Sequence, residues 1–167
     1  SRLSDWLFAE GHDTMEAVVG RELARRGLML AVAESCTGGL IGHRLTQVAG
    51  SSAYVDRGAV CYSNRAKTEM LGVPEELIAR YGAVSKEVAA AMACGIRERA
   101  NVSVGLSVTG IAGPGGGTEI KPVGLVYVGL DDGTGRPIAR EFRFHGDRNV
   151  IKQRSSQAAL DLLRRWL

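Results

Sequence analysis

The sequence lacks several features that mark particular protein classes. No run of eighteen apolar residues occurs, so we expect no segment that spans a membrane. Its three cysteines cannot all pair and form no Cys-x-x-Cys motif, and its three histidines are widely scattered. We therefore expect reduced thiols, no metal site and a reducing cytoplasm around the protein. Neither the P-loop spacing nor a Gly-x-Gly-x-x-Gly motif is present, which excludes the common nucleotide-binding signatures.

Charge is modest and dispersed. The net charge is +3, and the densest basic groups, at 21–26 and 164–165, are typical of solvated helix faces. A nucleic-acid-binding protein usually carries a stronger basic stripe, so nucleic acid is not an expected partner. Residues 1–6 carry an acid and no apolar signal core, which predicts that the protein is not secreted. A small-molecule substrate is the expected partner, in the cytoplasm.

Helix and strand signals alternate along the chain. The length of 167 residues and the apolar fraction of 45% suit one domain over residues 1–167 with a sizeable core. Helix signals follow Thr14, Gly39, Ala66, Pro74, Ser85 and Asp147, and strand signals cover 28–33, 54–62, 102–108, 123–130 and 138–144. Helices between strands imply parallel pairing, and the late hairpin adds an antiparallel strand. We predict a three-layer α/β/α sandwich with a mixed, mostly parallel sheet of about five strands.

Ser35 lies where a buried strand ends and a glycine-rich turn opens a helix. That position puts its hydroxyl at the carboxyl edge of the sheet, where open α/β folds place ligands. The amides of Thr37, Gly38 and Gly39 would be unpaired donors able to face a developing oxyanion. Two interpretations stay open: a nucleophile, or a serine or threonine that caps the following helix.

The segment after the second strand carries a tyrosine and a lysine. Lys67 could reach back to the sheet edge and act as a base if burial lowers its pKa. Tyr62 could relay a proton or orient the serine hydroxyl. The alternative is a strand-end tyrosine beside an exposed helical lysine.

Three further features are ambiguous from spacing alone. The loop 109–118 has five glycines and could cradle a phosphate with backbone amides, or serve as a flexible connector. Cys36 could compete as nucleophile, but His43 is two helical turns away, so a small buried residue is the favoured interpretation. Arg148 could bind a phosphate or lie on the surface.

Several ordered segments together resemble one family, the CinA C-terminal domain, which includes nicotinamide-nucleotide amidases. The resemblance covers about residues 12–166. The segments are Ala33-Glu34-Ser35-Cys36-Thr37-Gly38-Gly39, 49–52, 58 with 62–67, 82–85, 109–114, Lys121-Pro122-Val123-Gly124 and 144–148. Many relatives carry this domain behind a larger one that resembles molybdopterin-binding proteins, so the chain is expected to be the stand-alone form.

The resemblance implies a function and a site. The reaction would be hydrolysis of the carboxamide of nicotinamide mononucleotide to nicotinate mononucleotide and ammonia, through a serine acyl-enzyme, without metal or organic cofactor. A catalytic set of Ser35, Tyr62 and Lys67 is implied. The expected substrate-binding residues are Thr37, Gly38, Gly39, Asn64, Thr109, Gly110, Ala112, Gly113, Arg148 and Lys152.

Two positions depart from the family pattern. Lys152 stands where relatives tend to have arginine, which keeps the charge but loses a bidentate fork. Pro114 is followed by three glycines where relatives often have an acid. The alternative functions are a non-catalytic ligand-binding or regulatory module linked to competence or DNA damage, and a serine/lysine amidase for another small amide. The apolar helices suggest a homodimer.

Overall fold

The structure, a computed structural model, describes residues 13–167. The prediction about a missing signal core therefore lies outside the described residues. The elements in chain order are α1 (Met15–Arg26), β1 (Leu30–Glu34), α2 (Leu40–Thr46), the short 3-10 helix η1 (Ser51–Ala53), β2 (Val55–Val60), α3 (Asn64–Leu71), α4 (Glu75–Tyr81), α5 (Lys86–Ala100), β3 (Val104–Gly110), β4 (Leu125–Asp131), β5 (Ile138–Arg143) and α6 (Arg148–Trp166). None of these helices is long and apolar enough to cross a bilayer.

The five strands form one mixed sheet in the order β2-β1-β3-β4-β5. Strand β1 pairs in parallel with β2 and β3, because helices carry the chain from β1 to β2 and from β2 to β3. Strand β4 is antiparallel to both β3 and β5, because no helix separates these strands in the sequence. The predicted α/β fold with a mixed sheet is confirmed.

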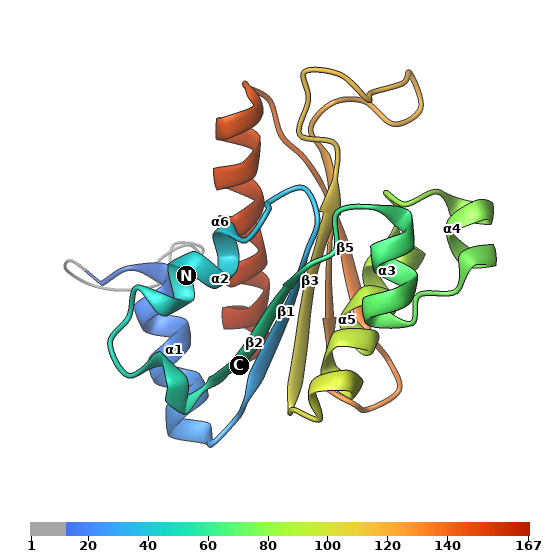
Figure 1. Ribbon diagram of the computed structural model, residues 1–167. Helices are drawn as coiled ribbons and strands as arrows, with labels where there is room; N and C mark the ends of the chain where they lie inside the picture. The colour runs from blue at the N-terminus through green and yellow to red at the C-terminus, as the bar shows by residue number, and fades with distance from the viewer. Residues whose placement is uncertain (1–12) are drawn as a thin grey trace.

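Helices pack on both faces of the sheet (Figure 1). Helices α1, α2 and α6 cover one face, and α3, α4 and α5 cover the other. Strand β1 is buried on both sides: Leu30 and Val32 belong to the α1/α2/α6 core, and Ala31 and Ala33 belong to the α5 core. Because side chains alternate along a strand, the next two residues, 34 and 35, are directed to opposite faces as well.

Side-chain caps decide where several helices begin. Thr14, Ser63, Ser85 and Asp147 each accept a hydrogen bond from the amide three residues on. The cap at Ser63 starts α3 at Asn64, two residues before the predicted start. Lys67 therefore lies on the first turn of α3, next to the end of β2.

The sequence pattern also predicts that Ile151, Ala158, Leu162 and Trp166 form the inward face of α6, and this prediction is partly wrong. Ile151 is buried as expected, and Leu162 and Trp166 pack against the α1/α2/α6 core, but residues 158, 162 and 166 are only half-buried. The helix instead turns Ser155, Ala159 and Leu163 to the core. The Ser155 hydroxyl donates to the carbonyl of Ile151 at 2.7 Å, so a polar side chain is accommodated inside the apolar stripe.

Candidate active site

The candidate site is built on the carboxyl ends of three neighbouring strands. The Ser35 amide donates to the carbonyl of Val108 in β3 at 3.0 Å, and the Cys61 amide after β2 donates to the carbonyl of Glu34 at 2.8 Å. These ladder bonds bring the residues that follow β1, β2 and β3 together at one edge. Ser35 is 7% exposed at this edge.

Glu34 caps the helix after β1, which the sequence reasoning missed. Its buried carboxylate accepts from the amides of Gly39, Ile41 and Gly42 at 3.1, 3.1 and 2.8 Å. An anion at a helix N-terminus is stabilised by the helix dipole and by the unpaired first-turn amides. The sequence signal was available: an acid ends a fully buried strand, just before a turn that opens a helix.

The helix-cap interpretation of Ser35 does not describe this turn. The N-cap position of α2 is Gly39, which has no side chain, and Ser35 lies four residues earlier. The expected oxyanion donors also need correction. The Gly38 amide donates to the Ser35 carbonyl at 3.1 Å and the Gly39 amide to Glu34, so both are already engaged. Within residues 13–167, the amides of Cys36 and Thr37 have no such partner.

Lys67 lies against Ser35 in the interior. Its side chain is 1% exposed, and its Nζ is 3.1 Å from Ser35 Oγ. The same Nζ donates to the backbone carbonyls of Cys61 at 3.0 Å and Tyr62 at 3.4 Å. The exposed-lysine interpretation is therefore wrong. Ser35 is on the α3/α5 side of β1, as the strand alternation requires, and Glu34 is on the α2 side.

Burial perturbs the ionisable groups around this pair. It lowers the pKa of Lys67, and the nearby thiols of Cys61 and Cys36 oppose that effect only partly. No carboxylate pairs with Lys67 in the described part of the chain. Burial also raises the pKa of Cys36 to about 12, so its thiolate is scarce near neutral pH. The nucleophile interpretation of Cys36 is disfavoured.

A small cavity opens in front of Ser35. Its volume is about 170 Å³. The residues that line it are Ser35, Cys36, Tyr62, Asn64, Lys67, Ala83, Val84, Thr109, Gly110, Ala112 and Arg148. The structure thus brings most of the expected site residues to one place, and it adds two that the sequence reasoning did not assign a role, Ala83 and Val84.

Tyr62 and Arg148 meet at the rim of this cavity. The Tyr62 side chain is 59% exposed, and its hydroxyl accepts from Arg148 Nη2 at 2.8 Å. Arg148 Nη1 donates to the carbonyl of Gly113 at 2.6 Å. Arg148 therefore connects the β2–α3 connection to the loop after β3. Since Ser35 and Lys67 are in direct contact, no relay through Tyr62 is required between them.

The remaining expected residues lie around the same edge. Thr109 lines the cavity and donates its hydroxyl to the carbonyl of Ala83 at 2.8 Å. Gly113 is not part of the cavity lining and contributes its carbonyl to Arg148. Lys152, on α6, extends toward the turn that follows Ser35: a Cβ atom placed on Gly38 would lie 3.7 Å from Lys152 Nζ.

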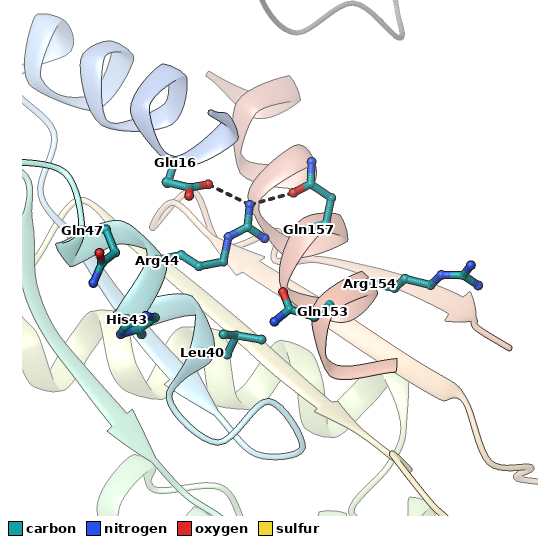
Figure 2. A pocket seen from close by; sticks show the side chains of 8 residues that line it. All are labelled: Glu16, Leu40, His43, Arg44, Gln47, Gln153, Arg154 and Gln157. Atoms are coloured by element: carbon teal, nitrogen blue, oxygen red, sulfur yellow. Dashed lines mark hydrogen bonds and ion pairs between the residues drawn. The ribbon is translucent and has the colours of Figure 1, made fainter. Parts of the chain in front are cut away.

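A larger cavity, of about 590 Å³, lies elsewhere, between α1, α2 and α6 (Figure 2). Arg44 occupies its centre and already donates to Glu16 and Gln157 at 2.7 Å each and to Ser156 at 2.9 Å. This guanidinium is therefore paired with a carboxylate and its donors are used. The second arginine of the lining, Arg154, donates to the backbone carbonyl of His145 at 2.9 Å. Over residues 13–167, no cluster of three or more His, Cys, Asp or Glu side chains could hold a metal ion.

Proteins of known sequence resemble nearly the whole chain. The CinA-like protein of Citrifermentans bemidjiense is 56% identical over 167 residues, and that of Geobacter sulfurreducens is 52% identical over 166 residues. Each alignment covers 99% of this chain but 40% of the relative. The chain therefore spans about two fifths of the length of these curated relatives.

Solved structures match the fold over almost their full length. The competence/damage inducible protein of Agrobacterium tumefaciens is 42% identical with a TM-score of 0.84, covering 93% of this chain and 97% of that one. The CinA superfamily protein of Escherichia coli is 31% identical with a TM-score of 0.84, covering 97% of both. The sequence pattern of the CinA C-terminal domain matches residues 12–167. This chain belongs to the CinA C-terminal domain family.

Proposed function

We propose that the protein is an amidase that hydrolyses the carboxamide of nicotinamide mononucleotide, with Ser35 as nucleophile and Lys67 as general base. The observation that carries the proposal is the 3.1 Å contact between Ser35 Oγ and Lys67 Nζ, inside the protein and without a carboxylate partner. A serine hydroxyl needs an adjacent base to become nucleophilic, and a desolvated lysine can supply one.

The three acceptors around Lys67 fit both of its protonation states: an ammonium donates to Ser35 Oγ and to two backbone carbonyls, and a neutral amine keeps the two carbonyl bonds. Its two backbone acceptors, the carbonyls of Cys61 and Tyr62, match the two N–H groups of an uncharged amine. The remaining lone pair then faces Ser35 Oγ, which donates its proton. Burial, which lowers the pKa of Lys67, favours this protonation state.

The proposed reaction proceeds in two halves. Ser35 Oγ bonds to the carboxamide carbon as its proton moves to Lys67. The tetrahedral intermediate then breaks its C–N bond, and Lys67 returns the proton to the departing nitrogen, which leaves as ammonia. Water attacks the resulting ester carbon, gives a proton to Lys67 and releases nicotinate mononucleotide, while Lys67 reprotonates Ser35 Oγ. One amide and one water become one carboxylic acid, ionised at neutral pH, and one ammonia.

The oxyanion of the intermediate needs preorganised donors. We assign this role to the free amides of Cys36 and Thr37, which follow the nucleophile directly, in place of those of Gly38 and Gly39. A well-placed donor of this kind stabilises the transition state by roughly 3 kcal/mol.

The size and the charges of the site support a nucleotide whose amide end enters first. A cavity of about 170 Å³ suits an aromatic ring with its carboxamide and leaves the sugar and phosphate outside. At the rim, both terminal nitrogens of the Arg148 guanidinium already donate hydrogen bonds, Nη1 to the carbonyl of Gly113 and Nη2 to the hydroxyl of Tyr62. Lys152, near Gly38 and without a hydrogen bond to another described residue, is the better-placed cation for the phosphate.

An ammonia-release assay tests the proposal. With nicotinamide mononucleotide as substrate, Ser35→Ala and Lys67→Met should each lower kcat by at least about a thousandfold, because each removes half of the nucleophile–base pair. Lys86→Met, which removes an exposed lysine at the start of α5, is the control and should retain wild-type activity. Full activity in either site variant would refute the assignment.

The same assay separates the other two candidate functions. Equal turnover of nicotinamide mononucleotide and of phosphate-free amides would indicate an amidase for another small amide. Binding of the nucleotide without turnover, undisturbed by Ser35→Ala, would indicate a regulatory module. The proposed amidase requires turnover that falls when the phosphate is removed.

A further inference from the structure

The Lys121-Pro122-Val123-Gly124 segment has no role in the chemistry proposed above, yet Lys121 is firmly held. It lies in the loop between β3 and β4, which projects beyond the carboxyl edge of the sheet (Figure 1). Lys121 Nζ donates to the carbonyls of Tyr81 at 2.6 Å and Val84 at 2.7 Å, in the connection between α4 and α5. These bonds join segments 40 and 37 residues apart.

The 81–85 connection, which runs from the last residue of α4 to the N-cap of α5, is held mainly by side chains. Lys121 donates to the carbonyls of Tyr81 and Val84, and the two carbonyls between them also accept hydrogen bonds from side chains. Ser85 Oγ donates to the carbonyl of Gly82 at 2.9 Å, and Thr109 Oγ1 donates to that of Ala83 at 2.8 Å. Four consecutive carbonyls thus depend on three side-chain donors, and the only charged donor is Lys121. Charge-assisted hydrogen bonds are the stronger kind.

The connection has a direct link to the cavity, because Ala83 and Val84 form part of its lining. Gly82 makes room for the lysine: its φ is +77°, and a Cβ atom there would lie 2.8 Å from Lys121 Nζ. Lys121 is itself anchored, since its amide donates to Thr118 Oγ1 at 3.0 Å and its carbonyl accepts from the Thr118 amide at 2.8 Å.

We propose that Lys121 is a positioning residue for the substrate cavity: its ammonium fixes the 81–85 connection so that Ala83 and Val84 form a rigid wall beside the substrate ring. Lys121 does not contact the cavity or the Ser35–Lys67 pair. Its removal should therefore weaken substrate binding and leave the chemical step unchanged. The kinetic part of this inference rests on the proposed amidase function, and the structural part does not.

The experiment compares the wild type with Lys121→Met, Lys121→Arg and the control Lys86→Met. In Lys121→Met, KM for nicotinamide mononucleotide should rise about tenfold or more, since two partly buried acceptors lose a charged donor. Its kcat and the pH dependence of kcat should stay within about twofold of the wild type, because the base is untouched. Lys121→Arg, which keeps charge and donors, should recover most of the lost affinity, and Lys86→Met should behave as wild type.

Hydrogen–deuterium exchange of residues 81–85 in the free proteins is the second measurement. It should be at least about tenfold faster in Lys121→Met, with α1 and α6 unchanged, whether or not the protein turns over the nucleotide. If the wild type releases no ammonia, the amidase proposal fails while the exchange result still decides the role of Lys121. Wild-type exchange in this segment, or an unchanged KM in an active enzyme, would overturn the inference. Should Lys121→Met not fold, Lys121→Gln carries the same expectations.

Discussion

The proposed chemistry depends on the side chain of Lys67, and its burial determines the pH at which it can act as a base. An ammonium removed from water loses hydration, and no carboxylate in residues 13–167 pairs with it in return. Its pKa is consequently lowered from the 10.5 of a free lysine side chain, so the neutral base is present at a lower pH than in water. The raised pKa of Cys36 excludes the neighbouring thiol from the same task.

The pH dependence of kcat should follow from this. Activity is expected to rise as Lys67 loses its proton and to level off above an apparent pKa clearly below 10.5. The measurement is kcat for nicotinamide mononucleotide from pH 5 to pH 10, with protein integrity checked at each end. A rise centred at the pKa of a free lysine would contradict a buried base.

The lowered pKa of Lys67 should also make the free energy of unfolding depend on pH. Between the lowered folded-state pKa and 10.5, the unfolded chain binds more protons at Lys67 than the folded protein does. Stability therefore rises with pH across that window through this group, and the rise is absent in Lys67→Met. The free energy of unfolding of the wild type and of Lys67→Met is measured by urea unfolding across this window, and the difference between the two proteins is compared. The difference is needed because the raised pKa values of the Cys36 and Cys61 thiols lower stability with rising pH in both proteins.

At the scale of elements, α3 brings Lys67, the proposed base, to Ser35. The Ser63 hydroxyl accepts from the Ala66 amide at 3.0 Å, which fixes the first turn of the helix and with it Lys67. In α1, Thr14 makes the equivalent cap to Ala17 at 3.3 Å on the other side of the sheet. The two caps are similar in kind but differ in what they position.

This difference predicts unequal effects of two matched substitutions. Ser63→Ala and Thr14→Ala should each lower the free energy of unfolding by about 1 kcal/mol, since each removes one capping bond. Only Ser63→Ala should also lower kcat, by several-fold, because the first turn of α3 frays beside the base. Chemical unfolding and the ammonia assay on both variants provide the comparison. Equal kcat values would mean that the cap does not help to position Lys67.

Elements were more predictable from the sequence than the contacts between them. The caps at Ser85 and Asp147, the buried strand before Ser35 and the antiparallel hairpin each have a local signal, and the structure contains all of them. The α6 stripe was misread because Ser155 interrupts its apolar pattern while bonding within its own helix.

The site required information that local patterns do not contain. Ser35 and Lys67 are 32 residues apart, and their contact depends on β2 lying next to β1. The family resemblance grouped them, whereas spacing alone left a helix cap open as the role of Ser35. Lys121 was missed for a related reason: its partners are backbone carbonyls, and these leave no trace in residue identity. Glu34 had a local signal, the acid that ends a buried strand just before a helix.

At the scale of the whole molecule, residues 13–167 form two hydrophobic cores, one on each face of the sheet. The α1/α2/α6 core includes Leu160, and the α5 core includes Leu71, at the end of the helix that carries the base. The proposed nucleophile and base belong to the second side, since Ser35 and Lys67 face α3 and α5, whereas Arg148 at the rim of the cavity comes from α6. Stability is shared between both sides, so it can be lowered from either one.

Two substitutions in these cores should have similar costs and different consequences. Gly95→Ala would place a Cβ atom 2.0 Å from the Leu71 carbonyl oxygen, so α5 and α3 must separate. Overpacking of this kind destabilises by about 1–3 kcal/mol, and Leu160→Ala, which leaves a cavity in the opposite core, by about 2–5 kcal/mol. Gly95→Ala should in addition lower kcat at least tenfold, because moving α3 displaces Lys67 from Ser35. Leu160→Ala should keep the wild-type kcat per folded molecule, measured well below its Tm. A loss of kcat that tracks stability equally in both variants would mean that the two cores are coupled, and that the site is not supported by the α3–α5 contact alone.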